Sequence, residues 1–150
     1  MSTDTASRLR AATPADAESL SDIFIAARAG MTYLPHLHSE QETRAFIASL
    51  VSRLEVIVAD LAGASVGFAA LDGPHLDHLY IAPSAQGKGI GAGLLAEVKR
   101  RRPGGFSLYV FQKNAGARRF YERHGLVCTS LSEGSRNEER LPDAQYSWPG

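Results

Sequence analysis

The stretch from Gln86 to Gly93 constrains the fold of this chain more than any other part of its sequence. Its letters, QGKGIGAG, place a glycine at every second position. An apolar run, Leu76 to Ile81, precedes it, and a helical pattern through Leu94, Leu95 and Val98 follows. Strand, glycine-rich turn and helix in this order direct a helix N-terminus, with its free N–H groups and positive dipole end, at a bound anion. The stretch therefore predicts a site for a ligand that carries phosphate.

Three phosphate-binding motifs compete for this stretch. A P-loop requires Gly-Lys followed by Ser or Thr, but here Gly87 and Lys88 are followed by Gly89. The dinucleotide fingerprint G-x-G-x-x-G/A is met in form, yet it also requires an acidic residue about 20 positions later. The segment at 107–112 lies there and contains no carboxylate. A nucleotide-binding oxidoreductase is therefore the weakest of the functions that we consider.

The third motif is Gln/Arg-x-x-Gly-x-Gly/Ala, which Gln86, Gly89 and Gly91 satisfy. This motif resembles the pyrophosphate loop of the GNAT superfamily of acyl-CoA-dependent N-acetyltransferases. The flanks agree, because LDHLYIAP at 76–83 resembles the central strand of that family. Asn114 and the segment ARRFYERHGL at 117–126 resemble its closing helix and turn. The resemblance covers nearly the whole chain.

The resemblance implies acetyl-CoA as the co-substrate. In this family a parallel pair of strands splays apart at mid-sheet, and the pantetheine arm of CoA lies in the gap on backbone amides. Residues 79–81 match the strand that supplies those amides, and residues 86–92 match the pyrophosphate loop. The cofactor-binding residues implied in this way are Leu79, Tyr80, Ile81, Gln86, Gly87, Lys88, Gly89, Ile90, Gly91, Ala92, Asn114, Ala117 and Tyr121.

The pattern of apolar residues and turns predicts an α/β fold, an α+β mixed sheet in a single domain over 1–150. Strands at 55–59, 64–71 and 76–81 are separated by short turns and form an antiparallel meander. A helix joins the strand at 76–81 to the strand at 106–110, so these two are parallel neighbours. In all we expect about seven strands and four helices. The other strands are expected at 8–12, 126–131 and 144–148, and the helices at 14–29, 39–52, 90–102 and 114–124.

Acyl transfer from a thioester to an amine requires a neutral amine, donors to the developing oxyanion and a proton for the departing thiolate. Tyr121 is the candidate for the proton donor, because a phenol with a pKa near 10 matches a thiolate of similar basicity. Asn114 lies seven residues earlier, on the same face of the predicted helix. A core tyrosine with a backbone hydrogen bond is the alternative. The family's usual proton donor, however, is a tyrosine that matches this position.

Asp77 and His75 are the candidates for a residue that takes a proton from the amine. Residues 75, 77, 79 and 81 share one face of the predicted strand, and residues 76, 78 and 80 share the other. In the family, acidic or histidine residues that relay this proton match the face of His75 and Asp77. His78 lies on the opposite face unless a bulge intervenes. Polarity at a strand end is the alternative for all three, and ordered water replaces a dedicated base in many relatives.

The acceptor is expected to be a primary amine of a small molecule or a peptide. The segment from Gly30 to His38 is unusually apolar for a loop, and it is either a packed connector or a wall of the acceptor pocket. Under the second interpretation Tyr33, His36 and His78 bind the acceptor. The sequence NEER at 137–140 either attracts a cationic amine or belongs to a solvated loop.

Composition excludes several other functions. The 16 basic and 16 acidic residues cancel, so nothing indicates binding of nucleic acid or of an anionic membrane. No apolar run approaches the ~20 residues of a membrane span, and the N-terminus has no signal-peptide core. Cys128 is the single cysteine, so no internal disulfide forms and we expect a cytoplasmic protein.

Two further expectations concern metal and assembly. The spacings His36-x-His38 and His75-x-x-His78 offer ligand pairs, but no cysteine pair or His-Glu-x-x-His helix completes a zinc site, so we expect no metal. The strand that ends at Trp148 is expected to be an edge strand, which would allow a homodimer to form by strand pairing.

The predicted function is direct transfer of the acetyl group from acetyl-CoA to a primary amine in a ternary complex. No residue resembles a covalent acyl carrier, since Cys128 lies outside the predicted site. The alternative is an acyl-CoA-binding module that senses the ligand without turnover. Tyr121 together with Asn114 favours the enzyme, because a sensor has no need of a proton donor.

Overall fold

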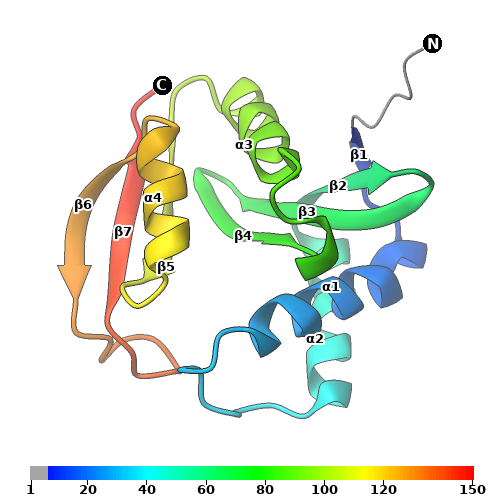
Figure 1. The fold of residues 1–150 in the computed structure, drawn as a ribbon, viewed down its shortest axis with the longest axis horizontal. Coiled ribbons are helices and arrows are strands. Elements are labelled where there is room, and N and C mark those ends of the chain that lie inside the picture. Colours follow the sequence, from blue (N-terminus) through cyan, green and yellow to red (C-terminus); the bar gives the residue numbers. More distant parts are fainter. Residues whose placement is uncertain (1–6) are drawn as a thin grey trace.

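Seven strands form one mixed sheet in the computed structural model, which describes residues 7–150 (Figure 1). The order across the sheet is β1-β2-β3-β4-β5-β7-β6. The strand bounds are β1 Arg8–Ala11, β2 Glu55–Leu61, β3 Ala64–Asp72, β4 His75–Ile81, β5 Phe106–Phe111, β6 Val127–Ser132 and β7 Asp143–Trp148. These strands and the predicted meander of β2, β3 and β4 agree with the sequence-based prediction to within about two residues at most ends.

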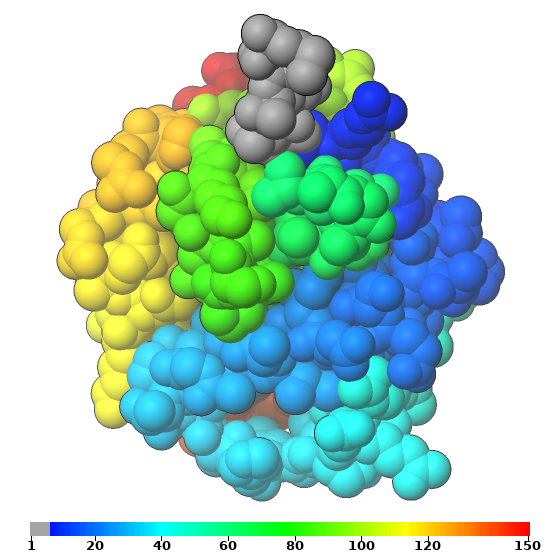
Figure 2. Space-filling view, turned by 45° about the vertical axis from the view of Figure 1, so that its right-hand side comes forward, coloured from blue at the N-terminus to red at the C-terminus, as the bar shows by residue number. Residues whose placement is uncertain are grey.

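Four helices cover the two faces of the sheet. Their bounds are α1 Ala17–Ala29, α2 Glu40–Arg53, α3 Ile90–Arg101 and α4 Ala115–Arg123, and short 3₁₀ turns occupy Pro14–Asp16 and Pro83–Ala85. Helices α3 and α4 pack on one face, where their apolar residues join those of β2 to β5. Helices α1 and α2 pack on the other face, mainly against β2 and β3. Figure 2 shows α3, in green, between α4 in yellow and the β2–β3 hairpin in teal.

Polar side chains fix where the helices begin. Ser39 accepts a hydrogen bond from the Glu42 amide at 3.1 Å, and the Glu42 carboxylate accepts one from the Ser39 amide at 2.8 Å. This is the capping box that the sequence predicted for α2. Asn114 starts α4 in a similar way, because its Oδ1 accepts a hydrogen bond from the Ala117 amide at 3.1 Å.

The parallel pair β4 and β5 separates almost as soon as it forms. Only His75 and Ser107 are paired between the two strands, although β5 pairs with β7 along its whole length. The sheet is therefore open between β4 and β5, as the wide space between the green β4 and the strands to its left shows (Figure 1). Backbone groups along this opening are left without strand partners, which makes it a place for a ligand to hydrogen-bond.

A β-bulge at Asp77 changes the faces of β4. The register with β3 shifts at this point and leaves Asp77 without a partner. Leu76 therefore packs in the same core as Leu79, on the side of α3 and α4. His78 and Tyr80 lie on the other side, against the ring of α1's Phe24. The prediction of unbroken alternation from 75 to 81 was wrong, because an extra residue reverses the side-chain direction.

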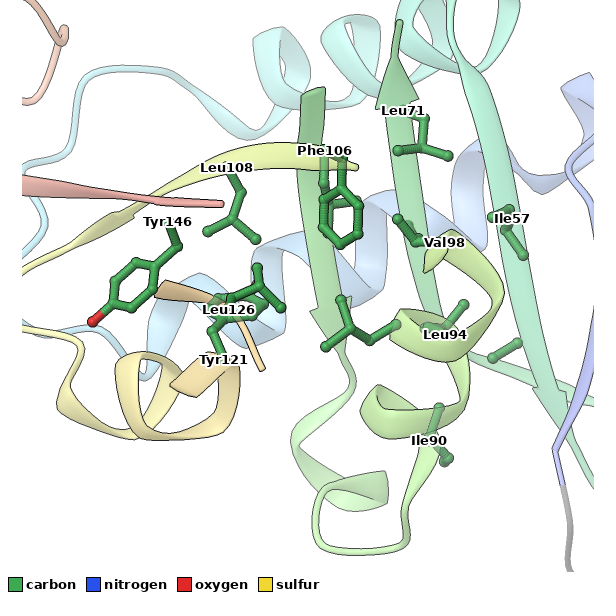
Figure 3. Packing of buried hydrophobic residues seen from close by; sticks show 14 of the residues in the cluster. Ile57, Leu71, Ile90, Leu94, Val98, Phe106, Leu108, Tyr121, Leu126 and Tyr146 are labelled. Atoms are coloured by element: carbon green, nitrogen blue, oxygen red, sulfur yellow. The ribbon is translucent and has the colours of Figure 1, made fainter. Parts of the chain in front are cut away.

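The core on the side of α3 and α4 is continuous across the opening. Figure 3 shows Leu94 and Val98 of α3 beside Phe106 of β5, with Tyr121 and Tyr146 further along the same layer. Leu94 and Val98 are fully buried. The two halves of the sheet are thus held together by apolar packing on one face where strand pairing is absent.

The last strand is not at the edge of the sheet. Strand β7, which ends at Trp148, lies between β5 and β6, so the predicted edge position was wrong. The position of β7 inside the sheet cannot be predicted from local sequence patterns, because it depends on pairing with a strand that is distant in the sequence. The edge strand on this side is β6, and its register with β7 shifts between Cys128 and Ser130. None of the helices within residues 7–150 has both the length and the hydropathy to cross a membrane.

Candidate active site

A cavity of about 240 Å³ passes between β4 and β5, where the sheet is open. Its walls come from both faces of the sheet, since α4 contributes on one side and the segments after α1 and before β7 contribute on the other. The residues that line it are Met31, Leu76, Asp77, His78, Leu79, Tyr80, Leu108, Tyr109, Val110, Phe111, Asn114, Ala117, Tyr121, Asn137, Glu139 and Asp143. Six of the predicted cofactor-binding or catalytic residues are thereby brought to one cavity: Asp77, Leu79, Tyr80, Asn114, Ala117 and Tyr121.

The glycine-rich loop takes the conformation that its sequence predicted. Gly87 and Gly89 have positive φ values of 78° and 80°, and Gly89 is the N-cap of α3. A Cβ atom built on either glycine would meet no atom within 4 Å, so the loop backbone is open to a ligand. Gly91 differs, because a Cβ atom there would lie 3.4 Å from the Phe120 ring of α4. The first two glycines leave room for a phosphate, whereas Gly91 allows two helices to approach.

Gln86 connects the loop to the end of β4 by a hydrogen bond. Its side-chain amide donates a hydrogen bond to the Ile81 carbonyl at 3.3 Å. Ile90 is buried in the core at 3% exposure, so only its backbone N–H remains to face a ligand, while Lys88 is exposed in the loop. The loop thus offers backbone N–H groups at the positive end of α3, which suits an anion such as pyrophosphate.

Two peptide groups of β4 are directed into the opening. The Ala82 amide donates to the Val66 carbonyl at 2.8 Å, which directs it toward β3. Backbone N–H groups alternate in direction along a strand. The amide of Tyr80 therefore also points toward β3, whereas the amides of Leu79 and Ile81 point into the gap. Leu79 and Ile81 are therefore the members of the predicted 79–81 set whose amides are free for a ligand, while Tyr80 contributes its side chain.

Tyr121 lies on α4, where its side chain packs in the core and also lines the cavity. The residue is 8% exposed, and burial raises the pKa of its hydroxyl, with a smaller contribution from Tyr80. Among residues 7–150 its hydroxyl makes no hydrogen bond, which does not fit the alternative of a core tyrosine satisfied by the backbone. A buried phenol with a raised pKa stays protonated at neutral pH and so retains a proton to donate.

Strand β7 holds α4 in place beside Tyr121. The Tyr146 ring is fully buried and lies 6.2 Å, centroid to centroid, from the Tyr121 ring. The Tyr146 hydroxyl donates to Glu122 Oε2 at 2.6 Å and accepts from Arg118 Nε at 3.0 Å. Residues on either side of Tyr121 are therefore tied to the sheet, which fixes the position of its ring.

Asp77 is the predicted base that reaches the cavity. It projects from the bulge of β4 and lines both this cavity and an adjoining hollow of about 260 Å³. The residue is exposed on its outer side, but partial burial raises the pKa of its carboxyl group, and Asp72 adds to the effect. A raised pKa makes the carboxylate a better proton acceptor than an ordinary aspartate.

His75 lies apart from the main cavity. It lines only the adjoining hollow, and its Nδ1 lies 2.8 Å from the Ser107 hydroxyl, at the point where β4 and β5 pair. The structure therefore brings Asp77 and Tyr121 to one cavity and leaves the other predicted base at its margin.

His78 is packed among aromatic rings in the cavity wall. Its ring lies 5.7 Å from Phe46 and 6.1 Å from both Phe24 and Tyr80, between centroids. Burial lowers the pKa of His78 to about 4, and the charge of Arg28 contributes. His78 is therefore neutral at physiological pH and is a weak base.

Arg28 of α1 and Glu139 of the β6–β7 loop meet on the side of the cavity opposite α4. Arg28 Nη2 lies 3.1 Å from Glu139 Oε2, and Arg28 Nη1 donates to the Tyr80 hydroxyl at 3.2 Å. The two charged side chains are 24% and 12% exposed. A second pair, His38 and Glu138, joins the same two segments at 3.1 Å but is half exposed to solvent.

The predicted acceptor residues of the α1–α2 segment differ in their placement. The Tyr33 ring contacts Phe111 of β5, with centroids 6.1 Å apart, and its hydroxyl is buried without a hydrogen-bond partner among residues 7–150. Burial raises the pKa of that hydroxyl, and Tyr80 contributes. His36 is exposed and does not line the cavity. In the part of the chain that the structure describes, no three acidic, histidine or cysteine side chains are grouped as metal ligands.

Comparison with known proteins identifies the family. Residues 15–141 match the model of the acetyltransferase (GNAT) domain. The chain belongs to the GNAT acetyltransferase family. The glycine-rich loop, the strand at 76–83 and the segment at 114–126 are the features by which the sequence resembled that family, and the open parallel pair is the feature that the resemblance implied.

Three GNAT proteins illustrate the similarity. Peptidyl-lysine N-acetyltransferase YiaC of Escherichia coli (strain K12) is 34% identical over 88 residues, 58% of this chain and 58% of that protein, so the match spans little more than half of the relative. The crystal structure of a GCN5-related N-acetyltransferase from Rhodopseudomonas palustris is 25% identical, with a TM-score of 0.80 over 100% of this chain and 99% of that one. The structure of yncA from Salmonella typhimurium, which was solved with acetyl-CoA, has a TM-score of 0.70 at 19% identity and covers 95% of this chain and 93% of that one.

Sequence reasoning missed several residues in or beside this GNAT cavity. Arg28 stands behind the lining, and its contact with Glu139 joins positions 111 apart in the chain. Met31 lines the cavity and lies in the apolar segment for which the sequence left two interpretations, a packed connector or a wall of the pocket. Asp143, at the start of β7, carried no signal of a site in the sequence.

Proposed function

We propose that the protein transfers the acetyl group of acetyl-CoA to a primary amine by direct transfer in a ternary complex. The observation that supports this most is that a protonated, unpartnered Tyr121 and the carboxylate of Asp77 line one cavity through the opened sheet. The E. coli relative is named a peptidyl-lysine N-acetyltransferase, which favours a lysine side chain as the acceptor. The complex of the Salmonella neighbour with acetyl-CoA favours that co-substrate.

The free backbone groups of the cavity fit an acyl-CoA. The N–H groups of the loop at 86–92, at the N-terminus of α3, would hold the pyrophosphate. The amides of Leu79 and Ile81 would hydrogen-bond the pantetheine arm, because they face the gap with no strand beside them. When bound there, acetyl-CoA supplies an activated acetyl thioester.

Asp77 and Tyr121 each carry out one of the proton transfers. Asp77 accepts a proton from the incoming ammonium group, since burial has raised its pKa. The neutral amine forms the new C–N bond, the C–S bond breaks, and the Tyr121 hydroxyl donates its proton to the leaving sulfur. Asp77 then releases its proton to solvent. The second proton leaves the nitrogen as the amide forms and restores the Tyr121 hydroxyl by way of solvent. The ammonium and the thioester thus give an amide, the thiol of CoA and one proton in solvent, and the reaction balances.

Release of free CoA from acetyl-CoA tests this proposal. We expect turnover with a lysine-containing peptide and compare it with small primary amines and free amino acids at equal concentration. The Tyr121→Phe variant is the matched control, because it keeps the ring and removes only the donated proton. Binding of CoA without turnover on any of these amines would instead support the acyl-CoA sensor.

A further inference from the structure

The cavity has a charge that the chain as a whole lacks. The chain carries 16 basic and 16 acidic residues. Among residues 7–150, however, the side chains that line the cavity include Asp77, Glu139 and Asp143 and no lysine or arginine. Arg28 stands just behind this lining, where it pairs with Glu139. A negative cavity attracts a cation and raises its local concentration.

Within residues 7–150, two carboxylates in this lining are held on one oxygen only. Asp143 Oδ2 accepts from the neutral Asn137 side-chain amide at 3.1 Å, whereas Glu139 is held by a charged partner. Its Oε2 accepts from Arg28 at 3.1 Å, while its Oε1 makes no hydrogen bond among residues 7–150. Arg28 is itself fixed, because it donates to the Tyr80 hydroxyl and lies 5.2 Å from the centre of the Phe24 ring. A carboxylate held by a guanidinium on one oxygen can still bind a second donor on the other.

The neighbouring glutamate shows what distinguishes Glu139. Glu138 also has a partner across the fold, because it lies 3.1 Å from His38 Nε2 in the segment before α2, but its side chain is 59% exposed and does not line the cavity. Glu139 is 12% exposed and lines the cavity. In Figure 1 the loop that carries both residues lies beside the segment between α1 and α2, and Figure 2 shows orange-brown atoms of this loop in a recess framed by that segment.

The apolar part of the lining suits an unbranched alkyl stem. Met31, Leu79, Leu108, Val110 and Phe111 line the same passage between β4 and β5 as Glu139. These side chains are apolar, so they accept methylene groups and offer nothing to a second charge. A lysine side chain combines a terminal ammonium with four methylene groups and has the chemistry of such a passage.

We infer that Glu139 is the residue that recognises the acceptor, that its free carboxylate oxygen receives the ammonium group of a lysine side chain, and that Arg28 is the positioning residue that holds it. This inference rests on the proposed function, because it assigns the amine specificity of the same site. It accounts for two observations that the acetyl-transfer chemistry itself does not require: the largely buried ion pair beside the cavity and the excess of carboxylates in the lining.

Steady-state kinetics with two peptides test the inference. One peptide carries lysine, and the other carries the aminooxy analogue of lysine, which is uncharged at neutral pH and still nucleophilic. At saturating acetyl-CoA, Glu139→Gln should lower kcat/KM for the lysine peptide by about 10- to 100-fold, the range of one charge-assisted hydrogen bond. The loss should lie mainly in KM, and kcat/KM for the aminooxy peptide should change little. Glu138→Gln should leave both values as in the wild type.

Further variants separate recognition from folding. Glu139→Asp keeps the charge and should recover part of the preference for lysine, and the rise in melting temperature on adding CoA should be the same in all variants. An equal loss with both peptides would mean that Glu139 only stabilises the loop, and no loss with either would mean that it takes no part; each result overturns the inference and leaves the proposed function standing. If the wild-type protein bound CoA but acetylated neither peptide, both would be overturned together.

Discussion

The buried, neutral His78 makes the stability of this protein depend on pH in a defined window. Folding lowers the pKa of His78 from 6.5 to about 4, chiefly through burial. Between these values the unfolded chain binds a proton at this position and the folded chain does not. The free energy of unfolding therefore falls as the pH decreases through this window, and the loss is complete below the pKa of the folded state.

The size of the effect follows from the difference in pKa. At about 1.4 kcal/mol for each pKa unit, the drop to about 4 corresponds to about 3 kcal/mol of lost stability. The carboxylates of Asp16 and Glu97 act at lower pH, because Arg10 holds the pKa of Asp16 at about 2 and the arginines of α3 hold that of Glu97 at about 2. Their stabilising contributions are present above their unfolded pKa values and are lost as the pH falls from about 4 to about 2, so the two windows are separate.

Urea unfolding at a series of pH values between 7.5 and 4.5, chosen to span most of the window, measures this effect. His78→Gln removes the titrating group and should flatten the dependence, even if it changes the stability at neutral pH. His36→Gln alters an exposed side chain and is the matched control, which should follow the wild type. A wild-type protein equally stable at both ends of this range, or a His78→Gln variant with the full dependence, would refute the reasoning.

Three further predictions concern the cofactor loop and the proposed acid. Acetyl-CoA at a hundredfold excess over its Kd should stabilise the protein by about 3 kcal/mol in thermal unfolding, and NAD should not; stabilisation by NAD alone would contradict the acyl-CoA site. Gly89→Val opposes a φ of 80° and adds side-chain atoms above the loop, so it should abolish CoA binding in calorimetry while circular dichroism remains that of a folded protein; unchanged affinity would place the phosphates elsewhere. Tyr121→Phe should lower kcat by about 10²–10⁴-fold with the KM for acetyl-CoA nearly unchanged and stability within about 1 kcal/mol of the wild type; full kcat, where chemistry limits turnover, would remove Tyr121 as the acid.

Local patterns in the sequence predicted most of the fold. The glycines of the loop, the Ser39 cap of α2 and the helix between β4 and β5 each act within a few residues, so their structural meaning is carried by short segments. The parallel relation of β4 and β5 followed from the crossover helix. These features were confirmed because the physics that determines them is local.

The parts that were not predicted depend on distant contacts. The position of β7 inside the sheet depends on its pairing with both β5 and β6, which no local pattern specifies. The bulge at Asp77 has no glycine or proline to mark it, and the Arg28–Glu139 pair joins segments 111 positions apart. The candidate site was therefore predictable around the glycine-rich loop and α4, where a motif exists, and not where α1 meets the β6–β7 loop, because long-range packing assembles that part.

Intact-mass spectrometry of the two reaction partners tests direct acetyl transfer most directly. The protein is first mixed with acetyl-CoA alone and then with a lysine-containing peptide, and the masses of both are followed with the release of CoA. We predict no acetyl group on the protein at either stage, and one acetyl group on the peptide for each CoA released. A protein that acquires the acetyl group before the peptide does would contradict direct transfer, and a peptide that remains unmodified while acetyl-CoA is bound would contradict the proposed activity.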